Sequence, residues 1–575
     1  MNITINFASL KNELETAYAF ADEKQACARL FNKDPYLWKS DPENIKSISN
    51  RLGWLSLPED FLAKVDELNE LSLQIKNEGY KYIVILGMGG SSLCSEVTRE
   101  TFPSANGYPK LLELDNTDPN AILNIEKQID LEKTLFIVAS KSGTTTEPNC
   151  FFEYYYSELI KKSATNPGKN FIAITDDGTP LVKIAQEHNF RKVFVNPSTI
   201  GGRYSVLSYF GVLPMALIGV DIKAVLTSAQ QMEMNCKTVT SSAINEGVSL
   251  GVALGVGQKH GRDKITFVMS QSIKAFGYWV EQLLAESTGK EGQGLIPIEG
   301  EHIDFPEVYG NDRVFIYMYL PTDYNNATDE RIESLGKAGH LVVKIEVPDK
   351  NALGAEFYRW EVATAIAGLI IGINPFDEPN VAESKKNTTN LLAEWEKNGS
   401  FEKPVPLVNV DSIEVFGNEK IIVLPNNNHE PVGDAIIHFA KLSQPNDYIA
   451  LLPYFLKTDD RNKILQEWRT SFRDTFKVAT TLGYGPRYLH STGQLHKGGP
   501  ATGLYIILVG DENDLPIPGE KYGFATLQRA QALGDYRSLD DKGRRVIRID
   551  LGKDIDANLK KLWHSVKHTI GHLVK

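Results

Sequence analysis

Residues 81–92 read KYIVILGMGGSS, an apolar run rich in β-branched residues that leads directly into a glycine-containing loop. A short apolar run bounded by turn residues predicts a strand that is buried on both faces. The polar, helix-patterned segment that follows completes a strand–loop–helix unit. Because strands covered by helices on both faces form parallel sheets, this stretch predicts an α/β fold.

The same pattern recurs along the chain in three sets. The first set continues with strand candidates at 111–116, 134–140, 170–175 and 192–196. The second comprises candidates at 264–270, 313–320 and 340–347, and the third at 420–425, 448–455, 503–510 and 545–550. Linkers rich in Gly, Ser or Pro do not separate the sets, so we expect them to pack tightly.

The three sets predict four regions. We expect a helical N-terminal cap over residues 1–55, followed by two three-layer α/β/α domains with mainly parallel sheets over 56–220 and 221–390. An additional C-terminal α/β region is expected over 391–575.

Composition narrows the possible functions. The 575-residue chain has a formal net charge of −12 and a pI near 5.5, which argues against general affinity for nucleic acid or an anionic membrane. The longest apolar run, 363–373, is too short to cross a bilayer, and the N-terminus soon turns polar, so we expect neither a membrane span nor a signal peptide. The four scattered cysteines suit reduced thiols in a cytoplasmic protein.

Two loops that follow strand candidates carry groups suited to binding a phosphate. The segment SKSGTTT at 140–146 places five hydroxyls, one ammonium and one glycine at a strand end and a helix start. A phosphate monoester needs several convergent donors, and a helix N-terminus adds unpaired N–H groups. We assign this role to Gly90 and Ser91 in the first loop and to Ser140, Lys141, Ser142, Thr144 and Thr145 in the second.

Other interpretations of these loops are a tight turn at 87–92 and an over-capped helix start at 140–148. Neither loop has the spacing of a nucleotide P-loop. The first also departs from the dinucleotide pattern Gly-x-Gly-x-x-Gly because it ends in serine, which disfavours a dehydrogenase.

The two loops resemble the phosphosugar-binding signature of the sugar isomerase (SIS) domain. Three further segments are similar to segments of the glucose-6-phosphate isomerase family and occur in that family's order: IGGRYSVLS at 200–208, QLLAESTGK at 282–290 and NPFDEP at 374–379. The resemblance covers roughly residues 60–390. The C-terminal region resembles the isomerase half of bifunctional transaldolase/glucose-6-phosphate isomerase proteins, and we identify no transaldolase domain before it.

The resemblance implies two SIS-type domains and a definite reaction. That reaction is the reversible interconversion of glucose 6-phosphate and fructose 6-phosphate, by ring opening and an enediolate intermediate, in glycolysis and gluconeogenesis. It implies a hexose 6-phosphate as the binding partner and neither a metal nor a redox cofactor. It also implies a homodimer, because in the family a histidine reaches the site from the partner subunit.

Aldose–ketose isomerisation needs a base, a group that stabilises the enediolate, and an acid–base group that opens the ring. Glu286 is the candidate base, because it closes an apolar helix whose end, with partial burial, should raise the carboxyl pKa. Gln282 lies one turn earlier on the same face, and Arg203 could balance charge on the enediolate. From the residues alone, Glu286 also suits a solvated helix end and Arg203 a structural ion pair; the resemblance places both in the site.

His302 and Lys385 complete the predicted catalytic set. His302 lies eleven residues before Arg313, the spacing of the ring-opening histidine in shorter bacterial members of the family. Lys385 matches the family's C-terminal lysine by counting from Phe-Asp, although Lys386 and Lys497 remain alternatives. The segment HSTGQLHKGG at 490–499 could border the active site, bind a second ligand, or form a long exposed loop.

Two other functions stay open at this point. A non-catalytic phosphosugar sensor would need the phosphate loops but not Glu286, Arg203 and His302 together, and it would usually carry a basic helix-turn-helix that we do not find. An isomerase for another phosphosugar, such as mannose 6-phosphate or an amino sugar, would differ only in pocket shape. An amidotransferase or a transaldolase is disfavoured, because we find neither an N-terminal cysteine nucleophile nor a separate barrel.

Overall fold

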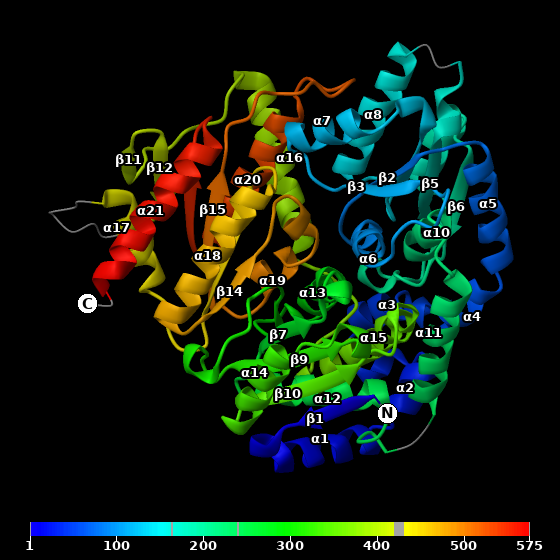
Figure 1. The fold of residues 1–575 in the computed structure, drawn as a ribbon, viewed down its shortest axis with the longest axis vertical. Helices are drawn as coiled ribbons and strands as arrows, with labels where there is room; N and C mark the ends of the chain where they lie inside the picture. Colours follow the sequence, from blue (N-terminus) through cyan, green and yellow to red (C-terminus); the bar gives the residue numbers. More distant parts are fainter. Residues whose placement is uncertain (1, 163–164, 239–240, 419–429, 574–575) are drawn as a thin grey trace.

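The computed structural model describes residues 2–162, 165–238, 241–418 and 430–573, and it contains three mainly parallel sheets flanked by helices (Figure 1). The predicted α/β fold is confirmed. The strand candidate at 420–425 lies outside the described residues. Within the described ranges, none of the helices is both long and apolar enough to cross a membrane.

The first sheet has the strand order β3-β2-β4-β5-β6, with every neighbouring pair parallel. Its strands are β2 (Tyr82–Gly87), β3 (Lys110–Leu114), β4 (Thr134–Ala139), β5 (Phe171–Asp176) and β6 (Lys192–Asn196). The connecting helices are α6 (Leu93–Thr101), α7 (Pro119–Gln128), α8 (Thr146–Lys161) and α9 (Pro180–Glu187). Because β2 and β4 are neighbours, the two predicted phosphate loops leave the same edge of the sheet.

The second sheet has the order β1-β10-β9-β7-β8. Its strands are β7 (Lys264–Met269), β8 (Ile296–Ile298), β9 (Arg313–Tyr319) and β10 (Leu341–Glu346), which are parallel, and β1 (Ile3–Asn6), which pairs antiparallel with β10. Its helices are α12 (Glu246–Lys259), α13 (Phe276–Thr288), α14 (Asn326–Lys337) and α15 (Leu353–Ile371).

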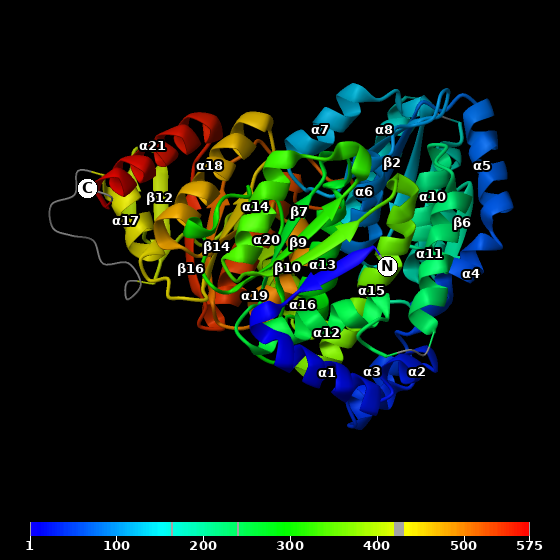
Figure 2. The ribbon, with the colours of Figure 1, turned by 60° about the horizontal axis from the view of Figure 1, so that its bottom comes forward.

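The N-terminal region is therefore not purely helical. We expected only a helical cap over 1–55, but the chain begins with β1, a strand too short for a period-two pattern to identify. The helices of this region and of the following linkage are α1 (Lys11–Glu23), α2 (Ala26–Phe31), α3 (Pro42–Ser49), α4 (Leu57–Leu62), α5 (Val65–Asn77), α10 (Tyr209–Leu217) and α11 (Ile222–Lys237). Helix α1 packs on α12 (Figure 2), and one continuous core, which includes Trp54, Trp279 and Trp360, joins these helices to the first two sheets.

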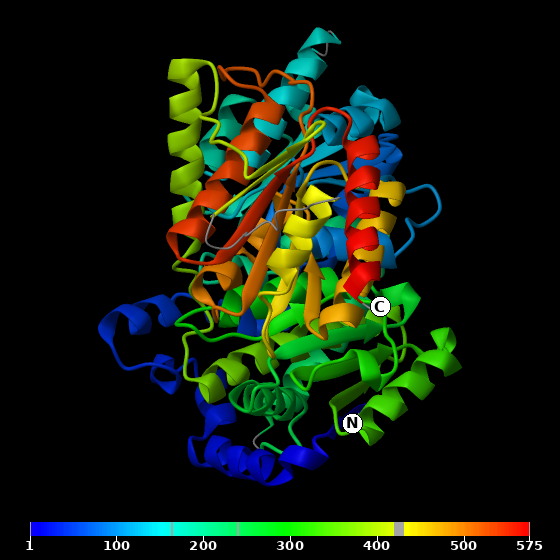
Figure 3. The same cartoon turned by 90° about the vertical axis from the view of Figure 1, so that its left-hand side faces the viewer.

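The C-terminal unit forms a third sheet of order β11-β12-β16-β15-β13-β14 (Figure 3). Its strands are β11 (Val408–Val410), β12 (Ile413–Gly417), β13 (Tyr448–Tyr454), β14 (Ala479–Leu482), β15 (Gly503–Val509) and β16 (Arg545–Asp550). Its helices are α16 (Val381–Asn398), α17 (Pro431–Ala440), α18 (Asp459–Phe476), α19 (Gly493–Gly498), α20 (Phe524–Asp541) and α21 (Ile555–Leu573). Residue 390, where we placed a domain boundary, lies inside α16.

The C-terminal unit repeats the strand order of the second sheet. Its parallel strands run β16-β15-β13-β14, and those of the second sheet run β10-β9-β7-β8, so the first, second, third and fourth parallel strands take the same places in both. The second-to-third connection, residues 299–312 in one sheet and 483–502 in the other, therefore leaves equivalent positions.

The C-terminal unit packs directly against the first two sheets. Phe524 and Leu527 of α20 share a core with Phe151 of α8 and with Leu391 of α16. A second shared core joins Ala285 of α13 to strands β13 and β15. The expected tight packing is thus built from buried apolar side chains.

Candidate functional site

Glu286 lies in the last turn of α13, which ends at Thr288 next to Gly289, as the sequence predicted. Its Oε1 is 3.3 Å from the Arg203 guanidinium, and Gln282 Nε2 donates to its Oε2 over 3.0 Å. Burial raises the pKa of Glu286 above its usual value, and the nearby Arg203 only partly opposes that effect. The raised pKa makes this mostly buried carboxylate a stronger proton acceptor than a solvated glutamate.

Arg203 is buried and held from four sides. It donates to Ser287 Oγ at 2.7 Å, to Glu378 Oε2 at 3.0 Å, and to the carbonyl oxygens of Pro375 and Asp377 at 3.0 and 2.9 Å. Buried guanidinium groups are stable only when paired, and here Glu286 and Glu378 supply the opposite charge. The arginine is therefore a fixed positive charge beside the candidate base.

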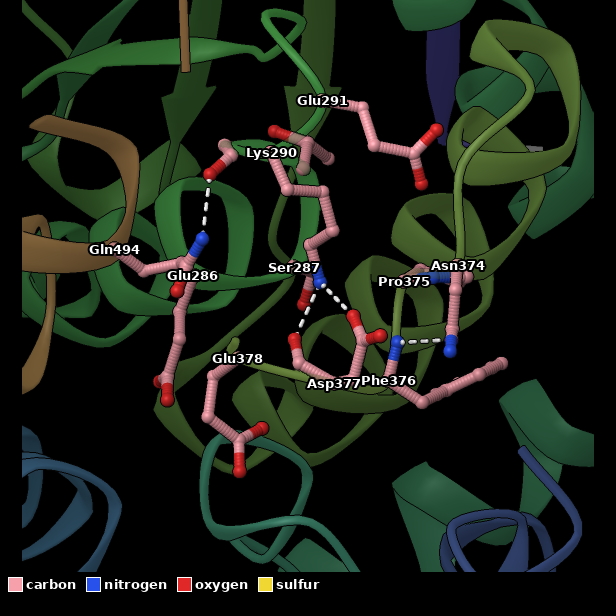
Figure 4. A network of polar contacts seen from close by, with 12 residues as sticks. Glu286, Ser287, Lys290, Glu291, Asn374, Pro375, Phe376, Asp377, Glu378 and Gln494 are labelled. Atoms are coloured by element: carbon pink, nitrogen blue, oxygen red, sulfur yellow. Dashed lines mark hydrogen bonds and ion pairs between the residues drawn. The ribbon is translucent and has the colours of Figure 1, made fainter. Parts of the chain in front are cut away.

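The segments around Arg203 form one polar network (Figure 4). Lys290 Nζ lies 2.6 Å from Asp377 Oδ1, and burial together with Arg203 lowers the pKa of Lys290 to about 8. In Figure 4 the carboxylates of Glu286 and Glu378 point to the same side of the view. The Arg203 guanidinium contacts both carboxylates. The resemblance includes these segments, but the sequence predicted no role for Lys290 or Asp377.

The first predicted phosphate loop packs against the segment that carries Arg203. A Cβ at Gly90 would overlap the carbonyl oxygen of Gly202, so only glycine permits this approach. Gly89 has a φ of +55°, and a Cβ there would lie 2.8 Å from the carbonyl oxygen of His490. Ser91, at the end of the same turn, is buried.

The second loop connects β4 to α8 and is held by its own hydroxyls. Ser140 Oγ donates to Thr145 Oγ1 over 3.0 Å, and the hydroxyls of Ser142 and Thr144 are 2.9 Å apart. The Lys141 ammonium lies 2.6 Å from Asp176 at the end of β5. The predicted donors are thus gathered at one edge of the sheet, but Lys141 already has a carboxylate partner.

A cavity of about 710 Å³ lies beside the second loop. Its lining includes Thr144, Thr145 and Glu147 from the loop and α8, Lys385 from α16, and His490 from the C-terminal unit. Lys386 does not line it. The sequence match of Lys385 therefore agrees with a position facing the phosphate loop.

His490 links this cavity to the candidate base. Its carbonyl oxygen accepts from Gln282 Nε2 over 2.7 Å, and its Nε2 lies 3.1 Å from Glu147 Oε1. Burial alone would raise the pKa of Glu147, but His490 and other partners leave it below its usual value. Of the interpretations left open for 490–499, the exposed loop is wrong: α19 is buried, and Gln494 donates to the carbonyl at the end of α13.

Two other predicted residues lie elsewhere. His302 is exposed and lines a separate cavity of about 380 Å³ with Glu299 and Lys274, so the chain does not bring it to Glu286. Lys497 is buried 2.6 Å from Asp535, which makes it part of a structural ion pair. Within the described ranges, no group of three or more His, Cys, Asp or Glu side chains is arranged to hold a metal ion.

Comparison with known proteins gives consistent matches. The family model for phosphoglucose isomerase matches residues 73–319. A probable glucose-6-phosphate isomerase of Methanococcus maripaludis is 32% identical over 380 residues, covering 59% of this chain and 84% of that protein. A glucose-6-phosphate isomerase of Mycoplasmopsis pulmonis is 26% identical over 386 residues, covering 59% of this chain and 90% of that protein.

Two solved structures share the fold. A hypothetical protein from Thermus thermophilus superposes with a TM-score of 0.58 at 23% identity, covering 68% of this chain and all of that one. A glucose-6-phosphate isomerase from Chlamydia trachomatis superposes with a TM-score of 0.53 at 16% identity, covering 67% of this chain and 86% of that one.

Proposed function

We propose, because this chain belongs to the phosphoglucose isomerase family, that it catalyses the reversible isomerisation of glucose 6-phosphate and fructose 6-phosphate. The observation that carries the proposal is the mostly buried Glu286 carboxylate, which is held between Arg203 and Gln282. The Gln282 amide in turn lies close to Gly89 of the first loop. A phosphosugar sensor would not need such a base.

The substrate phosphate is proposed to bind where the two loops meet. Gly90 offers a backbone N–H group and Ser91 a hydroxyl, and Ser140, Ser142, Thr144 and Thr145 offer hydroxyls at the start of α8. The Lys141 ammonium is paired with the Asp176 carboxylate, so the pair is neutral overall and Lys141 adds no free positive charge to the loop. Several neutral donors and a helix N-terminus can thus bind a dianion on a protein of net negative charge.

Glu286 then moves one proton between neighbouring carbons. Its carboxylate removes the proton from C2 of the open-chain aldose and returns it to C1, while a second proton moves from O2 to O1; the reaction is redox-neutral overall. Arg203 stabilises the negative charge of the enediolate intermediate because it is fixed before the charge develops.

Gln282 is proposed to orient the substrate as well as the base. Its Nε2 serves Glu286 and the His490 carbonyl, and its buried Oε1 has no hydrogen-bond partner among the described residues. A buried amide oxygen without a partner is costly, so a sugar hydroxyl is a suitable donor to it.

The remaining assignments follow the resemblance. We propose that the protein acts in the cytoplasm as a homodimer, without nucleic-acid or membrane partners, and that Lys385 contacts the substrate from the cavity beside the phosphate loop. His302 is exposed in a separate cavity, so this proposal gives it no part in the reaction within one chain.

A coupled assay for glucose 6-phosphate formed from fructose 6-phosphate tests the function. Glu286→Gln should lower kcat by about 10²–10⁴-fold and leave substrate binding largely intact, because the amide cannot accept the proton. Glu291→Gln, which changes an exposed glutamate five residues on, is the matched control. Near-normal turnover in Glu286→Gln contradicts the assignment.

A further inference from the structure

We propose that His490 is the acid that opens the sugar ring, and that the C-terminal unit thereby completes the active site within a single chain. This inference rests on the proposed isomerase function. It adds the identity of the ring-opening residue and the subunit that supplies it. It replaces the predicted contribution of His302 from a partner subunit.

The first observation is that His490 faces both halves of the site. Its backbone carbonyl accepts from Gln282, the same amide that holds Glu286. Its ring lines the cavity that contains Thr144 and Lys385. The histidine therefore lies between the candidate base and the phosphate loop, where C1 and the ring oxygen of a bound hexose 6-phosphate would be.

The second observation is that the imidazole is oriented by a buried carboxylate. His490 Nε2 lies 3.1 Å from Glu147 Oε1, and Gln531 Nε2 donates to the same oxygen over 2.7 Å. Thr117 Oγ1 donates in turn to Gln531 Oε1 over 2.8 Å. This chain fixes Nε2 on Glu147 and leaves Nδ1, which has no hydrogen-bond partner among the described residues, for the substrate.

The third observation is that the segment bearing His490 is firmly anchored. Arg487 lies 3.0 Å from Asp115 and 3.8 Å from Glu96, two largely buried carboxylates of the first domain. Burial alone would raise the pKa of Glu96, but Arg487 and Arg99 lower it to about 2. On the other side, Tyr488 Oη donates to Asp535 over 2.5 Å. The position of His490 is thus set by buried polar contacts to two domains.

The fourth observation is the contrast with His302. The two histidines lie on equivalent second-to-third strand connections of two sheets with the same strand order. His302 is exposed in a cavity of its own, whereas His490 is inserted between α13 and α8. The C-terminal connection contacts α13 on both sides of Glu286, at Gln282 and at Gly289.

The ring-opening step balances with His490 as the proton donor. The protonated imidazole gives the Nδ1 proton to the ring oxygen while the C1–O5 bond breaks, and the electron pair of the anomeric O–H bond becomes the second bond of the C1 carbonyl. Water in the cavity takes the proton of the anomeric hydroxyl and passes a proton back to the imidazole. No net proton is gained or lost.

Single substitutions test the residue. His490→Gln should lower kcat for cyclic fructose 6-phosphate by about 100-fold, while the inhibition constant of arabinonate 5-phosphate, an open-chain mimic of the intermediate, should change by less than about threefold. His564→Gln, which changes an exposed histidine on α21, is the matched control and should leave both values near those of the parent protein. Full turnover in His490→Gln overturns the proposal. The proposal also fails if His490→Gln and His490→Asn both lose analogue binding as strongly as they lose turnover. In that case the histidine would only shape the site.

Mixed subunits test the source. Chains carrying His490→Gln and chains carrying Glu286→Gln are co-expressed with different tags and purified through both tags or as a mixture. They should regain no activity, because each chain lacks one group of its own site. Recovery of about half of parental activity in dimers purified through both tags, or about a quarter in the unfractionated mixture, would show that the groups act across subunits and would overturn the inference. If the unaltered protein neither isomerises fructose 6-phosphate nor binds the analogue, the proposed function itself fails, which is a distinct result.

Discussion

The second domain and the C-terminal unit share one strand order but differ in what their equivalent connections do. The connection 299–312 packs against α18, where Arg473 donates to the His302 carbonyl and the His302 side chain stays exposed. The connection 483–502 folds into a short buried helix that packs against α13 and contacts α8. The comparison shows that strand order sets where a connection starts. The elements against which the connection packs then determine whether its side chains lie beside the candidate site.

Charge is the main physical difference between the two connections. The C-terminal connection carries Arg487 into a group of carboxylates on the first domain, Glu96, Glu113 and Asp115. Burial and the two neighbouring carboxylates raise the pKa of Glu113 well above its usual value, so this group is stable only with a cation nearby. The second-domain connection instead carries carboxylates to arginines: Glu301 is buried 2.9 Å from Arg313, and Asp304 lies 3.2 Å from Arg473 of α18.

The largest effect is expected from removing that cation. Arg487→Met should lower the stability of the folded protein by about 3 kcal/mol, because it leaves largely buried carboxylates unpaired, and it should reduce turnover by releasing His490. Urea denaturation and the coupled assay measure both effects. Arg537→Met removes an exposed ion pair 3.7 Å long and should cost less than about 1 kcal/mol. Equal stabilities for the two variants would contradict the anchoring role.

The next largest effect, on kcat/KM, distinguishes Lys385 from Lys386 as the predicted lysine. Lys385→Met should lower kcat/KM by about 10–100-fold, or roughly 1.4–2.8 kcal/mol of transition-state stabilisation, because the ammonium faces the cavity beside the phosphate loop. Lys386→Met, one position on and outside the cavity lining, should stay near the parent value. If Lys386→Met were the impaired variant, the register of the predicted lysine would be wrong.

Glu281, next to Gln282 on α13, tests how burial affects the pKa of a carboxyl group between the two regions. Burial, with a smaller contribution from Glu299, raises the pKa of Glu281 to about 8. A carboxyl with a raised folded-state pKa costs nothing below its unfolded pKa, and its cost grows as pH rises toward 8. Glu281→Gln should therefore stabilise the protein progressively between about pH 5 and 8, by at most about 1.4 kcal/mol per pH unit. Thermal unfolding at several pH values measures this, and a pH-independent difference would contradict it.

The smallest effect concerns the acid limb of the activity profile. Glu286 must be ionised to act, and because burial raises its pKa, activity should fall at a higher pH than for an ordinary glutamate. The negative charge of Glu378 contributes to that rise, so Glu378→Gln should move the limb to lower pH by less than about one unit. Glu291→Gln should leave it in place. A limb that moves upward in Glu378→Gln would contradict this electrostatic account of the base.

Much of the fold followed from local pattern. The apolar runs at 81–86, 134–140 and 264–270 became β2, β4 and β7, because strands covered on both faces must be apolar throughout. The short edge strand β1 was missed because its stability comes from pairing with β10, a contact that sequence spacing does not record.

The candidate site followed only in part. Gln282 and Glu286 are one helical turn apart, so their contact was predictable from α-helix geometry. The sequence predicted Lys141 as a free ammonium for the phosphate, but Asp176, 35 positions away in sequence, lies beside it. Lys497 looked reactive in a glycine-bounded segment, and its burial against Asp535 was not visible from local sequence.

By itself, the sequence predicted which residues offer donors to a phosphate, because donor chemistry is a local property, and the resemblance added Glu286 as the candidate base. Tertiary structure alone decided which histidine stands beside that base. His302 and His490 occupy equivalent connections, and only the packing of the third sheet, with its arginine against acidic groups of the first domain, brings His490 to Gln282 and Glu147. Contacts between residues hundreds of positions apart depend on how whole layers pack, which no local pattern specifies.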